Sequence, residues 1–405
     1  QGVAAGGCSA AAGVQTRDAF NNVSTATAAT TVTLSSSSGG NTFYSDATCT
    51  TVVTTRIIAL GTSTASFYFR DTVAGGPTLT AAAATFTSGT QTETITSGTL
   101  ARVAFTTAPK TQLAGACSTA ATVQTQDGFG NAANVGAATA VSLGTNSSGG
   151  ALYSDPACLA VIASVTIAAG GNAASFYYRD TRTGSPTLTA SSAGLANGTQ
   201  VETINPATPV KIAFLTGAQA LTAGVCSAIT TTQTQDTYSN ASPVGAATTL
   251  TYSSAPADVT FYSDATCTTV ITTRSLGAGA TNMSVYFRSN IAGAKTLTVA
   301  GGSLASAIQT ATINAAGVAR LAIVTPIQTV TAGACSAVTT VRSQDTFGNT
   351  ANVASATAVG LADSSGFGTF YSDPTCTTGI AGVTIAASGN SANFYWKDTR
   401  SGSST

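Results

Sequence analysis

A seven-residue stretch that occurs four times at a constant spacing constrains this chain more than any other feature. Its copies are Phe43–Cys49, Leu152–Cys158, Phe261–Cys267 and Phe370–Cys376. Each copy lies 109 residues after the one before it. A period of this length corresponds to one small domain per repeat and is too long for a solenoid coil. The sequence therefore predicts a tandem array of four domains, each long enough to bury a core of its own.

The period also sets the expected domain boundaries. We name the four ranges repeat 1 (1–96), repeat 2 (97–205), repeat 3 (206–314) and repeat 4 (315–405). Gln1 aligns with Lys110 and Thr405 aligns with Thr296, so we expect repeat 1 to lack its first strand and repeat 4 its closing strands. We expect neighbouring sequence to complete both, either within one continuous array or by strand addition between separate chains.

Short alternating segments predict strands throughout each repeat. In repeat 2, Ala121–Gln126 alternates polar and apolar residues, Val161–Ile167 is β-branched, and Thr199–Ile204 reads as the last strand. No helical period of useful length occurs. We therefore predict an all-β fold, with each repeat an antiparallel β-sandwich. The residues expected to anchor the four cores at equivalent positions are Phe67, Phe176, Val285 and Phe394. Arg179 and Asp180 follow the aromatic strand and could form an exposed ion pair of little energetic weight.

The eight cysteines fall into two series with the same period of 109 residues. Each repeat holds two of them, and an even, repeated count without any histidine leaves too few ligands for zinc. We therefore predict disulfides inside each repeat, while two buried free thiols per repeat remain the alternative. The predicted pairs are Cys8–Cys49, Cys117–Cys158, Cys226–Cys267 and Cys335–Cys376. Each would stabilise its repeat by about 4 kcal/mol in the chain-entropy model and would indicate an extracellular or cell-surface location.

The composition excludes several classes of function. Charged residues make up 7% of the chain, against about 25% in an average protein, and positive and negative charges balance. We therefore expect no nucleic-acid partner. No segment approaches the roughly 18 to 20 apolar residues of a membrane span. Because the chain has no histidine and no recurring paired carboxylates, we expect no enzymatic activity and no cofactor.

A second recurring motif has the form Asp-x-Phe/Tyr-x-Asn. Its copies are Asp18–Asn22, Asp127–Asn131, Asp236–Asn240 and Asp345–Asn349. Asp accepts hydrogen bonds from amides two residues on, and Gly or Asn tolerates positive φ, so the motif predicts a chain reversal. Calcium binding is the alternative. Calcium takes six to eight oxygen ligands, however, and each repeat offers only two or three recurrent acids, so we expect no metal site.

The tyrosine of each seven-residue stretch is the best candidate for ligand contact. In an extended strand its side chain points away from the preceding Phe or Leu, so we expect it to lie outward or at the sheet edge. These residues are Tyr44, Tyr153, Tyr262 and Tyr371. A glycan or a surface protein would be the partner. The alternative is that the tyrosines only pack, as aromatic residues on strands generally do.

Two motifs carry a resemblance to a known family. The sequence Asp127-Gly128-Phe129-Gly130-Asn131 and the later strand Thr183–Ala190 resemble the bacterial immunoglobulin-like repeats of large surface proteins, the invasin and intimin type among them. The resemblance implies immunoglobulin-like sandwiches used as a stalk, fibre or adhesin. One departure is that no cysteine pair surrounds a buried tryptophan, because Trp396 lies on the aromatic strand. We therefore expect the cysteines to form a local staple.

These observations lead to a prediction of function. We expect a structural segment of an extracellular repeat protein that forms a rod, stalk or fibre. The expected partners are further copies of the same array. The alternative is an adhesin whose immunoglobulin-like modules bind a glycan or a protein.

Overall fold

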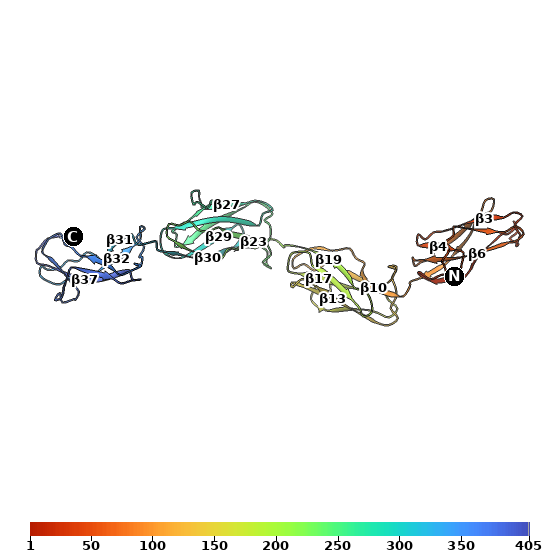
Figure 1. Ribbon diagram of the computed structural model, residues 1–405, viewed down its shortest axis with the longest axis horizontal. Helices are drawn as coiled ribbons and strands as arrows, with labels where there is room; N and C mark the ends of the chain where they lie inside the picture. Colours follow the sequence, from red (N-terminus) through yellow and green to blue (C-terminus); the bar gives the residue numbers. More distant parts are fainter. Residues whose placement is uncertain (404) are drawn as a thin grey trace. The chain divides into compact units, whose positions relative to one another are not determined.

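The computed structural model describes residues 1–403 and 405, which form short β-strands joined by turns (Figure 1). The chain divides into two compact units, Gln1–Pro206 and Ala207–Thr405, called unit 1 and unit 2 below. The division falls one residue after the predicted boundary between repeats 2 and 3. Within the described residues, the structure contains no helix with the length and apolar character that crossing a membrane requires.

Unit 1 contains repeats 1 and 2. The strands of repeat 1 are β1 (Gly2–Ala4), β2 (Ala12–Gln15), β3 (Thr30–Ser36), β4 (Asn41–Tyr44), β5 (Thr55–Ile58), β6 (Thr64–Asp71), β7 (Thr78–Ala82), β8 (Gly89–Thr92) and β9 (Thr94–Thr96). Those of repeat 2 are β10 (Leu100–Phe105), β11 (Thr111–Leu113), β12 (Ala121–Asp127), β13 (Thr139–Thr145), β14 (Gly150–Tyr153), β15 (Val161–Ile162), β16 (Ser164–Ile167), β17 (Ala173–Asp180), β18 (Thr187–Ser191), β19 (Gly198–Val201) and β20 (Thr203–Asn205).

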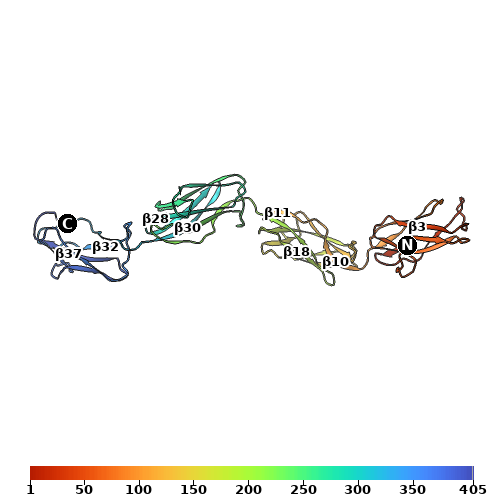
Figure 2. The ribbon, with the colours of Figure 1, turned by 45° about the horizontal axis from the view of Figure 1, so that its top comes forward.

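Repeat 2 is a sandwich of two antiparallel sheets (Figure 2). One sheet has the order β10-β12-β17-β14-β15 and the other β16-β13-β18-β19. The short strand β11 pairs in parallel with β20, the last strand of the repeat. The polar and apolar alternation of β12 matches its burial, because every second residue is buried. The strand pattern confirms the predicted immunoglobulin-like β-sandwich fold.

The core of repeat 2 lies between these two sheets. Phe176 of β17 is fully buried, and its ring packs edge-to-face on Phe105 of β10 at a centroid distance of 6.2 Å. Val141 of β13 and Leu188 of β18, which belong to the other sheet, are members of the same buried cluster. The residues at the position of Phe176 in the other repeats are buried as well, as predicted: Phe67, Val285 and Phe394.

Two segments predicted as single strands are each divided in two. Val161–Ile167 separates at Ala163, where the chain leaves the sheet of β14 as β15 and joins the sheet of β13 as β16. The segment Thr199–Ile204 separates at Glu202, so that β19 pairs with β18 while β20 pairs with β11. A strand that changes sheets keeps the same alternation on both sides of the break, so periodicity does not reveal it.

The ion pair considered for Arg179 and Asp180 is not formed. Asp180 is fully buried at the end of β17, where its carboxylate accepts hydrogen bonds from the Tyr178 hydroxyl at 2.5 Å and the Arg182 amide at 2.9 Å. Asp71 is equally buried in repeat 1 and accepts from Ser38 and the Val73 amide. These carboxylates hold the turn that follows the strand.

Unit 2 contains repeats 3 and 4. The strands of repeat 3 are β21 (Lys211–Phe214), β22 (Ala220–Thr222), β23 (Thr230–Gln235), β24 (Thr248–Ala255), β25 (Val259–Tyr262), β26 (Val270–Ile271), β27 (Thr273–Leu276), β28 (Asn282–Ser289), β29 (Gly293–Gly301) and β30 (Leu304–Asn314). Those of repeat 4 are β31 (Arg320–Ile323), β32 (Thr339–Gln344), β33 (Thr357–Gly360), β34 (Gly368–Tyr371), β35 (Gly379–Ile380), β36 (Gly382–Ile385) and β37 (Ser391–Asp398).

Repeats 3 and 4 have the same strand order in one sheet and differ in the other. The strand order β26-β25-β28-β23-β21 of repeat 3 corresponds to β35-β34-β37-β32-β31 of repeat 4. The opposite sheet of repeat 3 includes the long hairpin of β29 and β30, whereas that of repeat 4 consists of β33 and β36. Repeat 1 likewise has the sheet β2-β6-β4, with no counterpart of β10 among the described residues.

Candidate functional site

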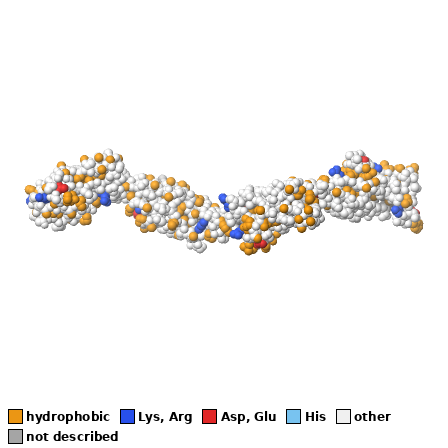
Figure 3. Space-filling model, turned by 90° about the horizontal axis from the view of Figure 1, so that it is seen from below, with side chains coloured by type: hydrophobic (Ala, Val, Ile, Leu, Met, Phe, Trp, Pro, Cys, Tyr) orange, Lys and Arg blue, Asp and Glu red, His pale blue; other side chains and the backbone are white. Residues whose placement is uncertain are grey.

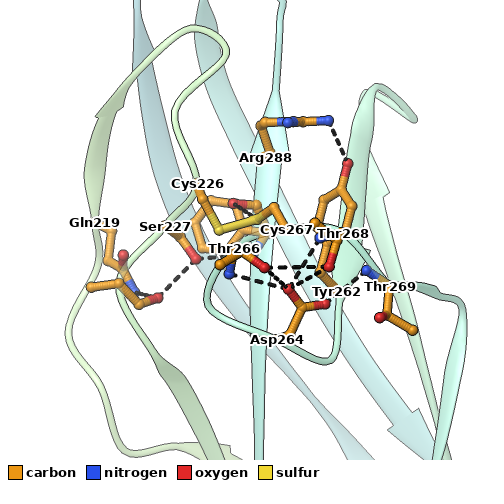
Figure 4. Close-up of a disulfide and its surroundings, with 12 residues drawn as sticks. Gln219, Cys226, Ser227, Tyr262, Asp264, Thr266, Cys267, Thr268, Thr269 and Arg288 are labelled. Carbon is orange, nitrogen blue, oxygen red and sulfur yellow. Dashed lines mark hydrogen bonds between the residues drawn. A yellow bond between two sulfur atoms is a disulfide. The ribbon is translucent and has the colours of Figure 1, made fainter.

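The structure joins the two cysteines of every repeat. In repeat 3 the bond connects Cys226, just before β23, to Cys267, in the turn after β25, with 5.8 Å between the Cα atoms (Figure 4). Both cysteines lie against β28, since the residue after Cys226 pairs with Phe287 and Cys267 Sγ is 4.0 Å from the Phe287 carbonyl oxygen. The bond therefore closes a loop along one sheet and does not connect the two sheets. The other bonded pairs are Cys8–Cys49, Cys117–Cys158 and Cys335–Cys376.

A buried serine beside the first cysteine fixes this arrangement. Ser227 donates its amide to the Phe287 carbonyl oxygen, and its hydroxyl oxygen accepts the Phe287 amide, both at 2.9 Å. The same residue type occupies the same place in every repeat: Ser9, Ser118, Ser227 and Ser336. Our sequence interpretation did not single out this serine, although the Cys-Ser dipeptide recurs with the period of the array.

The turn that carries the second cysteine is organised by an aspartate. The Asp264 carboxylate accepts hydrogen bonds from the amides of Thr266, Thr268 and Thr269 and from two threonine hydroxyls (Figure 4). These donors, with the Thr266 hydroxyl first, lower the pKa of Asp264. The carboxylate thereby holds Cys267 at a φ of 52°, a left-handed conformation that non-glycine residues rarely adopt.

Repeat 2 builds this turn without hydroxyl donors. Ala157 and Leu159 stand where repeat 3 has Thr266 and Thr268, so Asp155 accepts only backbone amides, the shortest from Ala160 at 2.8 Å. The Ala160 amide is the main cause that lowers the pKa of Asp155. Cys158 nevertheless has a φ of 53°, so the amide bonds are sufficient to hold the turn.

One of the four candidate ligand tyrosines does not lie outward as expected. Tyr262 is buried, because Arg288 of the neighbouring strand lies over its ring at 5.3 Å and donates a hydrogen bond to its hydroxyl at 3.0 Å. The other three tyrosines, Tyr44, Tyr153 and Tyr371, are half-buried. Tyr262 is therefore unavailable to a ligand unless Arg288 moves.

Each candidate tyrosine faces a second tyrosine across the sheet. Tyr153 of β14 is paired in register with Tyr177 of β17, which is half-buried too. Residues opposite one another in an antiparallel pair share a face, so two phenol rings lie side by side on the outer surface. The corresponding pairs in the other repeats are Tyr44 with Tyr68, Tyr262 with Tyr286, and Tyr371 with Tyr395.

The Asp-x-Phe/Tyr-x-Asn motif forms the predicted turn and, in unit 1, also joins repeat 2 to repeat 1. Asp127 accepts the amides of Phe129 and Asn131 at 2.9 Å, which closes the turn. The Asn131 side chain then reaches repeat 1, where its Nδ2 donates to the Thr72 carbonyl oxygen and its Oδ1 accepts the Ala74 amide, both at 2.9 Å. A single amide side chain thus satisfies one backbone acceptor and one backbone donor of the preceding repeat.

Unit 2 contains the same junction between repeats 3 and 4. Asn349 Nδ2 donates to the Asn290 carbonyl oxygen, and Asn349 Oδ1 accepts the Ala292 amide, both at 2.8 Å. Asp345 closes the turn as Asp127 does, and it accepts the Ala316 amide of the connecting segment at 2.9 Å. The two junctions therefore use the same contacts, made by residues at the same positions of the repeat.

An aromatic ring packs against a glycine at each of these junctions. A Cβ atom on Gly6 would lie 2.4 Å from Cε2 of Phe129, and one on Gly224 would lie 2.5 Å from Cζ of Phe347. Both glycines have positive φ, 77° and 83°, which glycine adopts at no steric cost. Only glycine can occupy these positions without displacing the ring.

The two junction carboxylates, Asp127 and Asp345, have lowered pKa values although both side chains are buried. Burial raises the pKa of Asp127, but hydrogen bonds from Asn131 and from the Gly98 amide outweigh it, so the net pKa is lowered. Asp345 has a lowered pKa for the same reasons. Within the described residues no three His, Cys, Asp or Glu side chains gather as a metal site would require.

Comparisons with known proteins give structural neighbours of low similarity. No protein-family model and no curated protein sequence matches the chain. The chain is similar to the Escherichia coli adhesin FdeC (16% identity, 77% of this chain and 94% of that one, TM-score 0.32). It is also similar to invasin, described as a bacterial integrin-binding protein (12%, 89% and 78%, TM-score 0.32), and to the Yersinia pseudotuberculosis adhesin InvE (18%, 52% and 58%, TM-score 0.24).

Proposed function

We propose that the chain is a structural segment of an extracellular or cell-surface repeat protein, in which four immunoglobulin-like domains follow one another as a rod, stalk or fibre. The proposed domains are 1–96, 97–205, 206–314 and 315–405. The observation that carries this proposal is the junction that recurs in both units with the same hydrogen bonds. A spacer gains length from every added copy, whereas a catalytic or signalling domain gains little from near-identical neighbours. We propose no enzymatic activity and no cofactor.

Location and surface chemistry support the same function. Persistent disulfides are found in oxidising compartments, which favours the exterior of the cell. Figure 3 shows charged side chains as isolated spots on the face in view, in keeping with a chain of which 7% is charged. A surface with so few charges opposes contact between copies only weakly. We therefore propose further repeats of this kind, in the same array or in neighbouring copies, as the partners.

Imaging of native material tests the proposal. Negative-stain electron microscopy of the protein as it occurs on or outside cells should reveal linear objects with a regular spacing of one domain per repeat. Compact particles without such a repeat would contradict a rod, stalk or fibre.

A hairpin peptide tests completion by strand addition. The open side of repeat 4 forms a groove of about 690 Å³ lined by Ile323, Phe370, Phe394 and Trp396. In repeat 3 the hairpin Gly293–Asn314 covers this side with apolar residues such as Leu297 and Ile313. A synthetic Gly293–Asn314 peptide added to the chain should shift the fluorescence of Trp396, its one tryptophan, to shorter wavelength.

A matched peptide provides the control for this experiment. Replacing Leu297 and Ile313 by Asp places two charges where the peptide would enter the apolar groove, which should abolish the shift. Equal shifts from the two peptides, or no shift from either, would contradict strand addition at this groove.

The second candidate function is binding of a glycan or a protein, and the paired tyrosines favour it. Tyr153 and Tyr177 present two half-exposed rings side by side, and such rings supply contact area at low entropic cost. A glycan array probed with the chain and with Tyr153→Ala separates the two functions. Binding that the substitution removes would support an adhesin, and the absence of any bound glycan would support the structural role.

A further inference from the structure

The Asp-x-Phe-Gly-Asn turn has contacts that its role as a chain reversal does not require. Asp127 and the backbone are sufficient to close the turn, because the amides of Phe129 and Asn131 both donate hydrogen bonds to Asp127 Oδ1. The Asn131 side chain nevertheless forms a donor and an acceptor bond to repeat 1, and Phe129 packs on Gly6 of the same repeat. These extra contacts recur at Asn349 and Phe347.

The turn of repeat 1 is seen in the structure without contact to another repeat. Asp18 accepts the amides of Phe20 and Asn22 at 2.9 and 2.8 Å, so the turn closes in the same way. The Asn22 side chain donates only to Asp18, at 3.1 Å. Phe20 is 87% exposed, against 50% for Phe129 and 43% for Phe347. The turn therefore forms without a docked repeat, and the partner covers part of the ring where one is present.

We propose that this turn is a recognition element that fixes each repeat on the one before it, with Asn131 and Asn349 as the positioning residues. Its partner is a repeat that presents three features. The first is a left-handed glycine that leaves room for the aromatic ring. The others are a free carbonyl oxygen and a free amide two residues apart in the loop after the aromatic strand, as in Thr72 and Ala74. The proposal rests on the proposed function, because fixed junctions matter for a protein that spans distance.

The chemistry of the element predicts how the junction responds to its surroundings. The bonds that each asparagine forms with the preceding repeat join neutral groups, and within the described residues neither junction contains an ion pair. Salt screens interactions between charges and leaves neutral hydrogen bonds largely unchanged. The coupling should therefore persist at high ionic strength and in the presence of a calcium chelator, in contrast to a junction held by charges or by a metal.

Amide hydrogen exchange in the intact chain tests the proposal. Asn131→Ala removes the acceptor of the Ala74 amide and should accelerate exchange in the peptide covering Thr72–Gly76 by about tenfold. Asn22→Ala is the matched control, since it removes the same bond within the turn but no contact to another repeat. It should leave exchange at 72–76 unchanged. Asn349→Ala should accelerate exchange around Ala292 in the same way.

A second pair of variants keeps the test valid if Asn131→Ala disturbs the fold of repeat 2. Phe129→Ala leaves every hydrogen bond of the turn in place and removes only the ring over Gly6, and Phe20→Ala is its control. Exchange around Ala74 should increase severalfold in the first variant and remain unchanged in the second.

Two results would overturn the proposal. One is unchanged exchange around Ala74 in both Asn131→Ala and Phe129→Ala. The other is an equal acceleration by the repeat 1 controls, which would mean that the turn acts only inside its own repeat. Because these measurements use single chains, they do not depend on whether native material proves to be a rod or a fibre.

Discussion

Repeats 3 and 4 carry nearly the same motifs, yet they bury their aromatic residues to different extents. In repeat 3, Phe261 and Phe287 are 5% and 1% exposed under the hairpin of β29 and β30. The corresponding Phe370 and Trp396 of repeat 4 are half-buried and line the open groove. The sequence pattern of a strand therefore sets which face is apolar, and the opposite sheet decides whether that face is covered.

The largest difference should follow from removing the aromatic residue itself. Phe287→Ala should destabilise repeat 3 by about 3 to 5 kcal/mol, because the ring is fully buried between both sheets. Trp396→Ala should cost repeat 4 less than half as much, since water already reaches one side of the groove. Hydrogen exchange followed by mass spectrometry resolves the two repeats, whose peptides differ in sequence. Equal losses would mean that the groove is covered in solution.

Removing the disulfides should affect the folding of repeat 3 and of repeat 4 differently. Both bonds close loops of the same length, with a sequence separation of 41 residues. Each should therefore contribute about 4 kcal/mol in the chain-entropy model. Repeat 4 buries fewer core residues than repeat 3 and has less stability to lose. Replacing both cysteines by alanine should leave repeat 3 folded and unfold repeat 4.

The control for this comparison is chemical. Peptide mapping without reduction should identify Cys226–Cys267 and Cys335–Cys376 in the parent chain. Free thiols, or a bond between repeats such as Cys49 with Cys117, would contradict the predicted pairing.

Substituting the buried serines tests whether the cysteine-bearing sheet is equally stable in repeats 3 and 4. Ser227→Ala leaves the buried Phe287 amide without its acceptor, which should cost about 1 to 3 kcal/mol. Ser336 forms the same bond to Trp396 and is equally buried at 5%. Ser336→Ala should therefore cost repeat 4 the same amount, measured by the same exchange experiment. A much smaller effect in repeat 4 would mean that the cysteine-bearing sheet also differs between the repeats.

The sequence predicted those parts of the fold that depend on local alternation. Phe176 and its counterparts were assigned to the core because apolar residues recur with a period of two, and all four are buried. The break at Ala163 was missed, since the residues on both sides remain suitable for a strand. The burial of Asp180 was missed as well, because the Tyr178 hydroxyl and the Arg182 amide that compensate it are set by the turn.

The candidate site was predictable only to the extent that its contacts are local. The motif Asp127–Asn131 was identified as a turn from its own residues. Its bonds to repeat 1 could not be predicted, because the Thr72 and Ala74 groups are backbone atoms that any residue provides. The contact between the Arg288 and Tyr262 side chains depends on pairing between two strands, β25 and β28, that alternation alone does not specify.

The smallest expected effect concerns the aspartate turns, which should not distinguish repeat 3 from repeat 4. Hydrogen bonds from Thr266 and Thr375, respectively, are the main causes that lower the pKa of Asp264 and of Asp373 below the ordinary value of 3.8. The unfolded chain thus binds these protons at higher pH than the folded chain does. The contribution of each carboxylate to stability is present above the ordinary pKa and is lost as the pH falls through the folded pKa.

Carbon-13 NMR titration of the carboxyl groups measures this effect directly. Asp264 and Asp373 should both titrate below pH 3.8, and Thr266→Val and Thr375→Val should raise the two pKa values by similar amounts. Asp155, which has no hydroxyl donor in its turn, is the internal control and should be unaffected by either substitution. A normal pKa for Asp373 together with a lowered pKa for Asp264 would show that the open groove loosens repeat 4 as far as its disulfide turn. The difference between the two repeats would then extend beyond the side that the hairpin covers.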